Sequence, residues 1–93
     1  GSVYFVVYNV DRSDAGNLRA DTRAGHLDYV NGYEVVFGGP LVDPEGEMCG
    51  SLIVVDLPSH DAAVAFAAGD PYALAGLFEQ SSVTAFRQVM GPA

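Results

Sequence analysis

The order of its apolar segments constrains the fold of this chain more than any other feature. Each segment rich in β-branched and aromatic residues is short, ends near a turn residue and is typical of a β-strand. These segments cover residues 3–8, 33–37, 51–55 and 83–89. The stretch at 13–31 contains no proline and predicts a helix with Ser13 or Asp14 as its N-cap and Gly32 as its stop.

A second helical region lies between the third and fourth predicted strands. Ser59 predicts an N-cap for a helix that ends at Gly69. The pair Asp70-Pro71 fits the N-cap and first position of another short helical segment, which we expect to reach about Phe78. The order β-α-β-β-α-β predicts a ferredoxin-like α+β fold, with an antiparallel sheet and the helices on one face.

Composition limits the classes of partner. Ninety-three residues make one domain, at 3–93, after Gly1 and Ser2, which we interpret as an expression scar. The net charge of −8, with four basic residues in all, disfavours nucleic acid as a partner. No apolar run approaches the about 18 residues that a membrane span needs. Cys49 stands alone and cannot form an internal disulfide, so we expect a cytoplasmic protein.

The predicted strands carry apolar side chains on both faces. Along residues 3–8 and 51–55, successive apolar side chains point to opposite sides of the sheet. Helices on one face leave the other exposed, with roughly several hundred Å² of apolar surface, more than a monomer usually shows to water. We therefore expect two chains to pack sheet to sheet, as a homodimer or a higher oligomer.

Two arginines and a histidine gather on one face of the first predicted helix. At about 100° per residue, Arg19, Arg23 and His26 fall beside the apolar stripe rather than opposite it. Neither arginine has an acidic residue three or four positions away, so each takes its counter-charge from a distant carboxylate or from a bound anion. The histidine is a candidate acid–base group, and Asp70 is the candidate that orients its ring.

Each of these residues also has a structural interpretation. The arginines fit ion pairs with surface acids, and His26 fits a hydrogen-bonded residue at a helix–sheet boundary. Asp70 before Pro71 is a preferred helix start, although a carboxylate can cap a helix and orient a histidine together. We expect His60 to be exposed and Cys49 to be structural. The chain has no glycine-rich phosphate loop, nucleotide fingerprint or zinc-ligand spacing, so we expect no metal and no cofactor.

A series of short motifs, in order along nearly the whole chain, resembles the YCII-related (YciI-like) domain family. The motifs are Arg19-x3-Arg23-x2-His26-Leu27, Gly39-Pro40-Leu41, Gly50-Ser51, Asp70-Pro71-Tyr72-x2-Ala75-Gly76-Leu77-Phe78 and Val83-x2-Phe86. The resemblance implies a ferredoxin-like fold within the dimeric α+β barrel superfamily. It also implies a site centred on His26 and Asp70, with the two arginines at recurring basic positions and Gly39-Pro40 in a pocket-lining turn.

The resemblance guides the functional expectation as well. One branch of the family eliminates HCl from a chlorinated hydroxyquinol, and muconolactone isomerases are structural relatives. We therefore expect a cofactor-independent lyase or isomerase that acts on a small cyclic, anionic or phenolic metabolite. His26 would take the proton, Asp70 would orient it, Arg19 or Arg23 would hold a substrate oxygen, and Tyr72 would line the pocket. The alternative is a dimeric domain that binds a small molecule, or serves as an accessory subunit, without catalysis.

Overall fold

The computed structural model describes residues 3–92 and contains four strands and three helices. Gly1 and Ser2, the expected expression scar, lie outside the described residues. The elements are β1 (Tyr4–Asp11), α1 (Leu18–Val30), β2 (Val35–Val42), β3 (Met48–Val55), α2 (His60–Gly69), α3 (Pro71–Leu74) and β4 (Phe78–Phe86).

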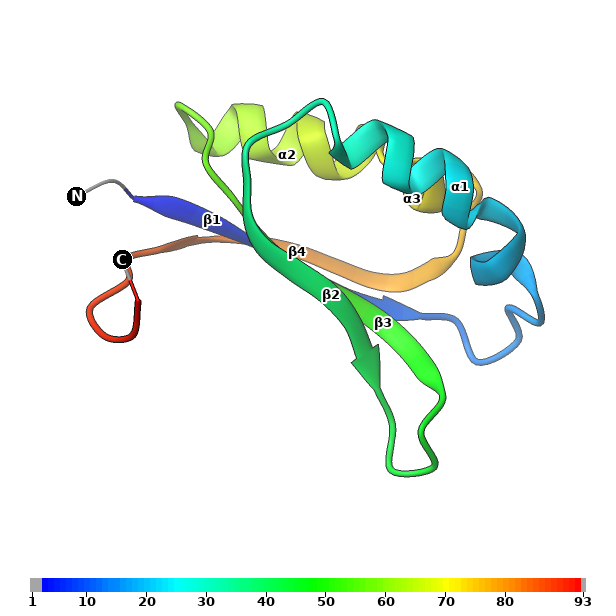
Figure 1. The fold of residues 1–93 in the computed structure, drawn as a ribbon. Coiled ribbons are helices and arrows are strands. Elements are labelled where there is room, and N and C mark those ends of the chain that lie inside the picture. The colour runs from blue at the N-terminus through cyan, green and yellow to red at the C-terminus, as the bar shows by residue number, and fades with distance from the viewer. Residues whose placement is uncertain (1–2, 93) are drawn as a thin grey trace.

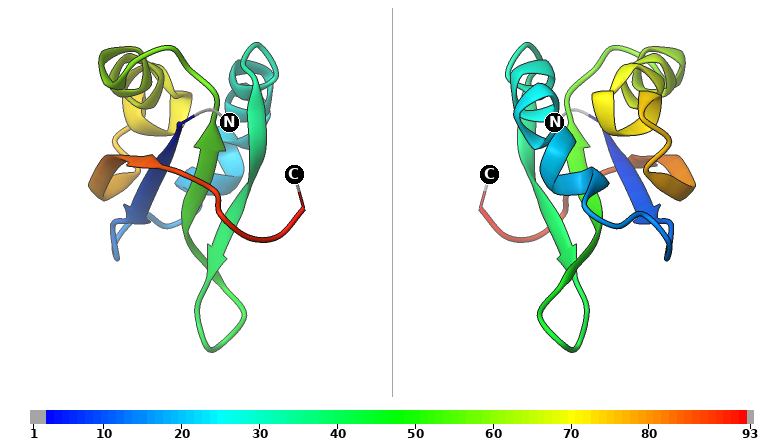
Figure 2. Two further views of the ribbon diagram at one scale, coloured as in Figure 1. Left: turned by 90° about the vertical axis from the view of Figure 1, so that its left-hand side faces the viewer. Right: turned by 90° about the vertical axis from the view of Figure 1, so that its right-hand side faces the viewer.

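The strands form one antiparallel sheet in the order β2-β3-β1-β4. All three helices lie over one face of this sheet, and no helix covers the opposite face (Figure 1). The two side views in Figure 2 show the same layering, with the β2–β3 hairpin extending beyond the helices. The ferredoxin-like α+β fold predicted from the sequence is confirmed. No helix in the part of the chain at 3–92 is long and apolar enough to cross a membrane.

The core lies between the sheet and α2. Its buried cluster consists of Phe5, Val7, Ile53, Val55, Ala63 and Phe66. Tyr29 of α1 packs against this cluster, and its hydroxyl donates a hydrogen bond to the backbone carbonyl of Phe66 over 3.0 Å. A side chain at Gly69 would bring its Cβ to 2.5 Å from the same hydroxyl. The glycine therefore lets α1 approach the end of α2 closely.

The N-cap predictions for α2 and α3 were correct, and the predicted start of α1 was wrong. Ser59 caps α2 by accepting a hydrogen bond from the backbone of Ala62, and α2 ends at Gly69 as predicted. The first helix, however, begins at Leu18 rather than near Ser13. Gly16 has a φ of +59°, a left-handed conformation that interrupts a right-handed helix before that point.

The strand boundaries also differ from those predicted. β2 was expected to end at Phe37, yet it runs to Val42 through Gly39 and Pro40, which were expected in a turn. β2 is an edge strand, and an edge position tolerates a proline because half of its backbone groups need no partner. β1 ends three residues later, at Asp11, and β3 begins three residues earlier, at Met48, than predicted.

The last predicted helix and strand were misplaced as well. The short helix α3 ends at Leu74, and Phe78 begins β4 instead of ending a helix. A turn at Gly76, with a φ of +76°, separates the two elements. β4 therefore starts before Val83 and ends at Phe86.

Candidate active site

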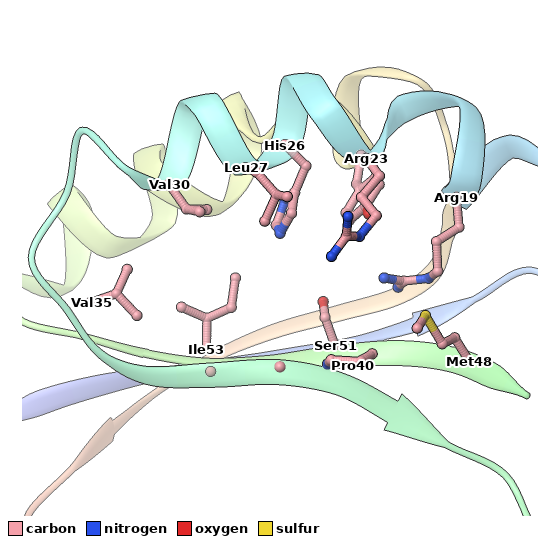
Figure 3. Close-up of a pocket in the computed structure, with 13 residues that line it drawn as sticks. Arg19, Arg23, His26, Leu27, Val30, Val35, Pro40, Met48, Ser51 and Ile53 are labelled. Carbon is pink, nitrogen blue, oxygen red and sulfur yellow. The ribbon is translucent and has the colours of Figure 1, made fainter. Parts of the chain in front are cut away.

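A cavity of about 190 Å³ lies between α1 and the β2–β3 part of the sheet. Arg19, Arg23 and His26 enter it from α1, and Ser51 enters it from the sheet (Figure 3). Apolar side chains that include Val30 and Ile53 line the rest. The volume is below the about 300–1,000 Å³ of pockets for drug-sized ligands, so the cavity suits a compact molecule such as a single ring.

His26 and Asp70 meet beside this cavity although 44 positions separate them in the chain. The Nδ1 atom of His26 lies 2.9 Å from Oδ1 and 3.0 Å from Oδ2 of Asp70. Their side chains are 12% and 4% exposed. A carboxylate accepts hydrogen bonds, so this contact places a hydrogen on Nδ1, and in the neutral imidazole Nε2 is then the nitrogen that can accept a proton.

The local sequence explains why Asp70 is available at this point. Asp70 is the N-cap of α3, and its Oδ1 accepts a hydrogen bond of 2.9 Å from the backbone of Tyr72. Proline follows it at the first helical position, where a missing N–H costs nothing. The same carboxylate thus caps α3 and contacts His26, so the capping interpretation and the pairing interpretation of Asp70 hold together.

Tyr72 connects the histidine to the basic end of the cavity. Its ring stacks on the His26 ring with centroids 4.1 Å apart and planes inclined by 16°. The guanidinium carbon of Arg19 lies 4.7 Å from the centroid of the same ring. Burial raises the pKa of the Tyr72 hydroxyl, more than the nearby charges of Arg19 and Arg23 lower it. The hydroxyl therefore stays protonated and able to donate a hydrogen bond near neutral pH.

The two arginines on α1 have different surroundings. Arg19 donates two hydrogen bonds of 2.8 Å to the carboxylate of Asp11 at the end of β1, and both side chains are largely buried. This pairing raises the pKa of Arg19. Arg23 points into the cavity (Figure 3) and has no ion pair with any residue between 3 and 92. A distant carboxylate is thus the counter-charge of Arg19, whereas Arg23 lines the cavity with no carboxylate of residues 3–92 paired to it.

The sheet side of the cavity includes residues that the sequence analysis placed differently or missed. Gly39 and Pro40 line the cavity as predicted, but from within β2 rather than from a turn. Ser51, which lines the cavity, and Asp11, which binds Arg19, were not singled out as site residues. The sequence does contain an indication of Ser51. It lies on the same face of its strand as the apolar Ile53, so it is a polar residue on a face that is expected to be buried.

The remaining candidates, His60 and Cys49, are not among the residues that line this cavity. His60 is exposed, as expected, and its Nε2 lies 3.3 Å from the backbone carbonyl oxygen of Val83. Cys49 is a free, half-buried thiol. Across residues 3–92, no group of three or more His, Cys, Asp or Glu side chains is arranged to hold a metal ion.

Comparison with known proteins identifies the family. The model of the YCII-related domain matches residues 3–87. The chain belongs to the YCII-related domain family. Proteins named YciI from Escherichia coli O6:H1 and Shigella flexneri are each 30% identical to this YCII-related domain, in alignments that cover 91% of this chain and 97% of each relative.

A solved structure is similar along nearly its full length. It is 5-chloro-2-hydroxyhydroquinone dehydrochlorinase (TftG) from Burkholderia phenoliruptrix AC1100, in complex with 2,5-dihydroxybenzoquinone. The TM-score is 0.81 at 29% sequence identity, and the match covers 95% of each chain. A ligand-bound enzyme of this size and fold therefore shares the architecture of this YCII-related domain.

Proposed function

We propose that this YCII-related domain is a cofactor-independent lyase or isomerase that acts on a small cyclic, anionic or phenolic metabolite. The observation that carries the proposal is the contact of 2.9 Å between His26 Nδ1 and the buried Asp70 carboxylate, on the wall of a cavity that also receives Arg23. A buried acid–base pair supplies a base for proton transfer, and a nearby unpaired cation can stabilise the negative charge that forms on the substrate.

In this proposal His26 acts as the general base. Its Nε2 removes a proton from a carbon or hydroxyl of the ring, and the imidazole becomes an imidazolium. Asp70 holds the ring in the required tautomer and stabilises the positive charge that forms, while it remains a carboxylate itself. A positioned base of this kind contributes a factor of about 10²–10⁴ to a rate.

Arg23 stabilises the negative charge that appears on the substrate when the proton leaves. The electron pair of the broken bond moves onto a ring oxygen, where a guanidinium can bind it. In an elimination, that charge then expels a leaving group as an anion. In an isomerisation, the imidazolium returns the proton to a different ring atom. Neither route consumes an oxidant, a reductant or a second substrate.

Three observations support a small ring as the substrate. The cavity of about 190 Å³ is too small for most drug-sized ligands. The similar dehydrochlorinase was solved with 2,5-dihydroxybenzoquinone, a single six-membered ring with oxygens on its edge. Stacked Tyr72 and His26 add a flat aromatic surface near the cavity, which suits a planar ligand.

The direct test replaces the base. His26→Ala should lower turnover at least about 100-fold, measured with 5-chloro-2-hydroxyhydroquinone and with unchlorinated hydroxyquinols. His60→Ala is the matched control, because this exposed histidine lies away from the cavity, and it should keep full activity. A fully active His26→Ala variant would contradict the proposal. Ligand binding without turnover in the wild type would instead favour a non-catalytic binding domain.

We also propose that two copies associate through the face of the sheet that the helices leave open. Tyr8, Phe37 and Phe86 on the strands remain 42%, 53% and 36% exposed. Register places Tyr8 beside Leu52 and Phe37 beside Val54, so apolar side chains adjoin one another across this face. A cytoplasmic location, expected from the single cysteine, stays a prediction.

A further inference from the structure

Three polar side chains from three different strands form a hydrogen-bonded row that ends at the cavity. Asn9 lies on β1, between Ser51 on β3 and Ser81 on β4. Asn9 and Ser51 are 2% and 3% exposed, on the sheet face that otherwise buries Phe5 and Val7. Burial of polar groups in an apolar layer is costly unless each one finds a partner. All three side chains are hydrogen-bonded in one row.

The lengths of the two hydrogen bonds give this row a direction. Ser81 Oγ lies 2.6 Å from Asn9 Oδ1, a length typical of an O–H···O hydrogen bond. Asn9 Nδ2 lies 3.2 Å from Ser51 Oγ, within the range of an N–H···O hydrogen bond. Ser81 therefore donates to the amide oxygen, and the amide nitrogen donates to Ser51.

The direction of the row determines what Ser51 offers to a ligand. Ser51 Oγ accepts from Asn9 inside the sheet, so its own hydrogen is left to donate elsewhere. No side chain or backbone group within residues 3–92 accepts a hydrogen bond from this hydroxyl. The Ser51 oxygen points from the sheet into the cavity, which the Arg23 guanidinium enters from the opposite side (Figure 3).

We propose that Ser51 is a specificity-determining residue, because its hydroxyl donates a hydrogen bond to the ligand oxygen that Arg23 binds. Asn9 is the positioning residue: its amide donates to Ser51 Oγ and so keeps the Ser51 hydrogen directed at the ligand. The ligand class that fits is a small ring with an anionic oxygen, as a carboxylate, phenolate or enolate, on the edge near Ser51 and Arg23. The rest of the ring lies against Val30 and Ile53. This inference rests on the proposed function in using the same cavity and the same contact between Arg23 and an anionic ligand oxygen, but it does not depend on turnover.

The hydrogen bond that Ser51 donates is tested by measuring how two ring compounds, one with oxygens and one without, bind to Ser51→Ala and to a control variant. Ser51→Ala should bind 2,5-dihydroxybenzoquinone about 10- to 100-fold more weakly by calorimetric titration, because one hydrogen bond to a charged oxygen is lost. Its affinity for toluene, which has no oxygen, should stay within about twofold. Ser82→Ala, a change of an exposed serine outside the row, should bind both rings like the wild type. Unchanged binding of 2,5-dihydroxybenzoquinone, or an equal loss for both rings, would overturn the inference.

Reversal of the row tests the positioning role of Asn9. Asn9→Asp keeps the shape but replaces the amide donor with a carboxylate, so the Ser51 hydroxyl turns to donate into the sheet. Affinity for 2,5-dihydroxybenzoquinone should fall as far as in Ser51→Ala at pH 8. At lower pH the introduced carboxyl becomes protonated and can again donate a hydrogen bond to Ser51. The ratio of the variant's affinity to the wild-type affinity, measured at the same pH, should therefore rise as the pH falls. An affinity equal to that of the wild type at every pH would contradict the role of Asn9.

The two proposals can fail separately. The Ser51 experiments measure binding and need no turnover, and the His26→Ala experiment measures turnover. Unchanged affinity in Ser51→Ala overturns the specificity role and leaves the proton-transfer chemistry standing. Full turnover in His26→Ala overturns the proposed function and leaves the affinity change at Ser51 standing. If Asn9→Asp fails to fold, as judged by circular dichroism, the comparison of Ser51→Ala with Ser82→Ala still decides the inference.

Discussion

The two faces of the sheet differ in the side chains that they carry and in what covers them. The face under the helices carries the apolar core and, within it, the buried polar side chains Asn9 and Ser51, and Ser51 lines the same cavity as His26. The face without helices carries exposed aromatic residues such as Tyr8 and Phe37. Polar groups are retained in a protected layer only where partners satisfy them, and exposed apolar groups indicate a surface for association. We therefore propose separate roles for the two faces: ligand chemistry at the cavity on the covered face, and association of two copies through the open face.

The largest expected effect separates the two roles of Asp70 on the covered face. Asp70→Asn keeps a good helix N-cap, so the free energy of unfolding should change by less than about 0.5 kcal/mol. It removes the negative charge beside His26, so turnover should fall at least about 100-fold. Asp70→Ala is the control that loses both roles, and it should also lose about 0.5–2 kcal/mol of stability in urea denaturation. Equal turnover in Asp70→Asn and the wild type would leave the carboxylate as a cap alone.

The next effect concerns the open face. Phe37→Asp places a charge among apolar side chains and should weaken self-association at least about 30-fold, as loss of a buried aromatic anchor does at an interface. Sedimentation equilibrium measures the shift from dimer to monomer. Leu74→Asp, a change of an exposed residue on the helix layer, is the control and should leave the oligomer unchanged. A wild-type protein that sediments as a monomer at micromolar concentration would remove the proposed role of the open face.

A smaller effect sharpens the contrast between the two arginines. Arg23→Ala should weaken binding of 2,5-dihydroxybenzoquinone about tenfold, with little change in stability, because Arg23 has no protein carboxylate to leave unpaired. Arg19→Ala leaves the largely buried Asp11 carboxylate without its partner and should cost about 1–3 kcal/mol of unfolding free energy. Calorimetric titration and urea denaturation measure the two effects. The reverse pattern would show that Arg19 is the ligand-binding cation.

The smallest expected effect is a pH dependence. Because burial raises the pKa of Tyr72 above its ordinary value of 10.0, the unfolded chain loses this proton before the folded chain does. Stability should therefore be fully present below about pH 10 and should fall as the pH rises further. Tyr72→Phe should reduce the decrease in the free energy of unfolding that occurs between pH 8 and 11. Part of the loss should remain in the variant, because burial also raises the pKa of Tyr29.

The sequence was informative where local signals decide structure. The N-caps at Ser59 and Asp70 and the stop at Gly69 depend on a few neighbouring residues, and each is present as predicted. The boundaries of β2 and β4 depend on which strands become neighbours, which no local signal contains. Pro40 resembles a strand end until the strand proves to lie at the edge of the sheet.

The same distinction applies to the candidate site. His26 and Asp70 were predicted to meet because the fold places the first helix beside the end of the second. The hydrogen-bonded row was missed, because its partners lie 42 and 72 positions apart and meet only through strand register. Asp11 was missed for a similar reason: it reaches Arg19 after β1 extends three residues beyond its predicted end.

Edge strand β2 lines the cavity but contributes no residue to the buried cluster that holds the protein together. Substitutions at Val35 or Pro40 can therefore reshape the space offered to a ligand without opening holes in that cluster. A scaffold of this kind places one wall of the cavity, on β2, outside the cluster of residues that maintains folding. Ligand preference can then diverge between proteins with this architecture while their thermal stability stays nearly constant.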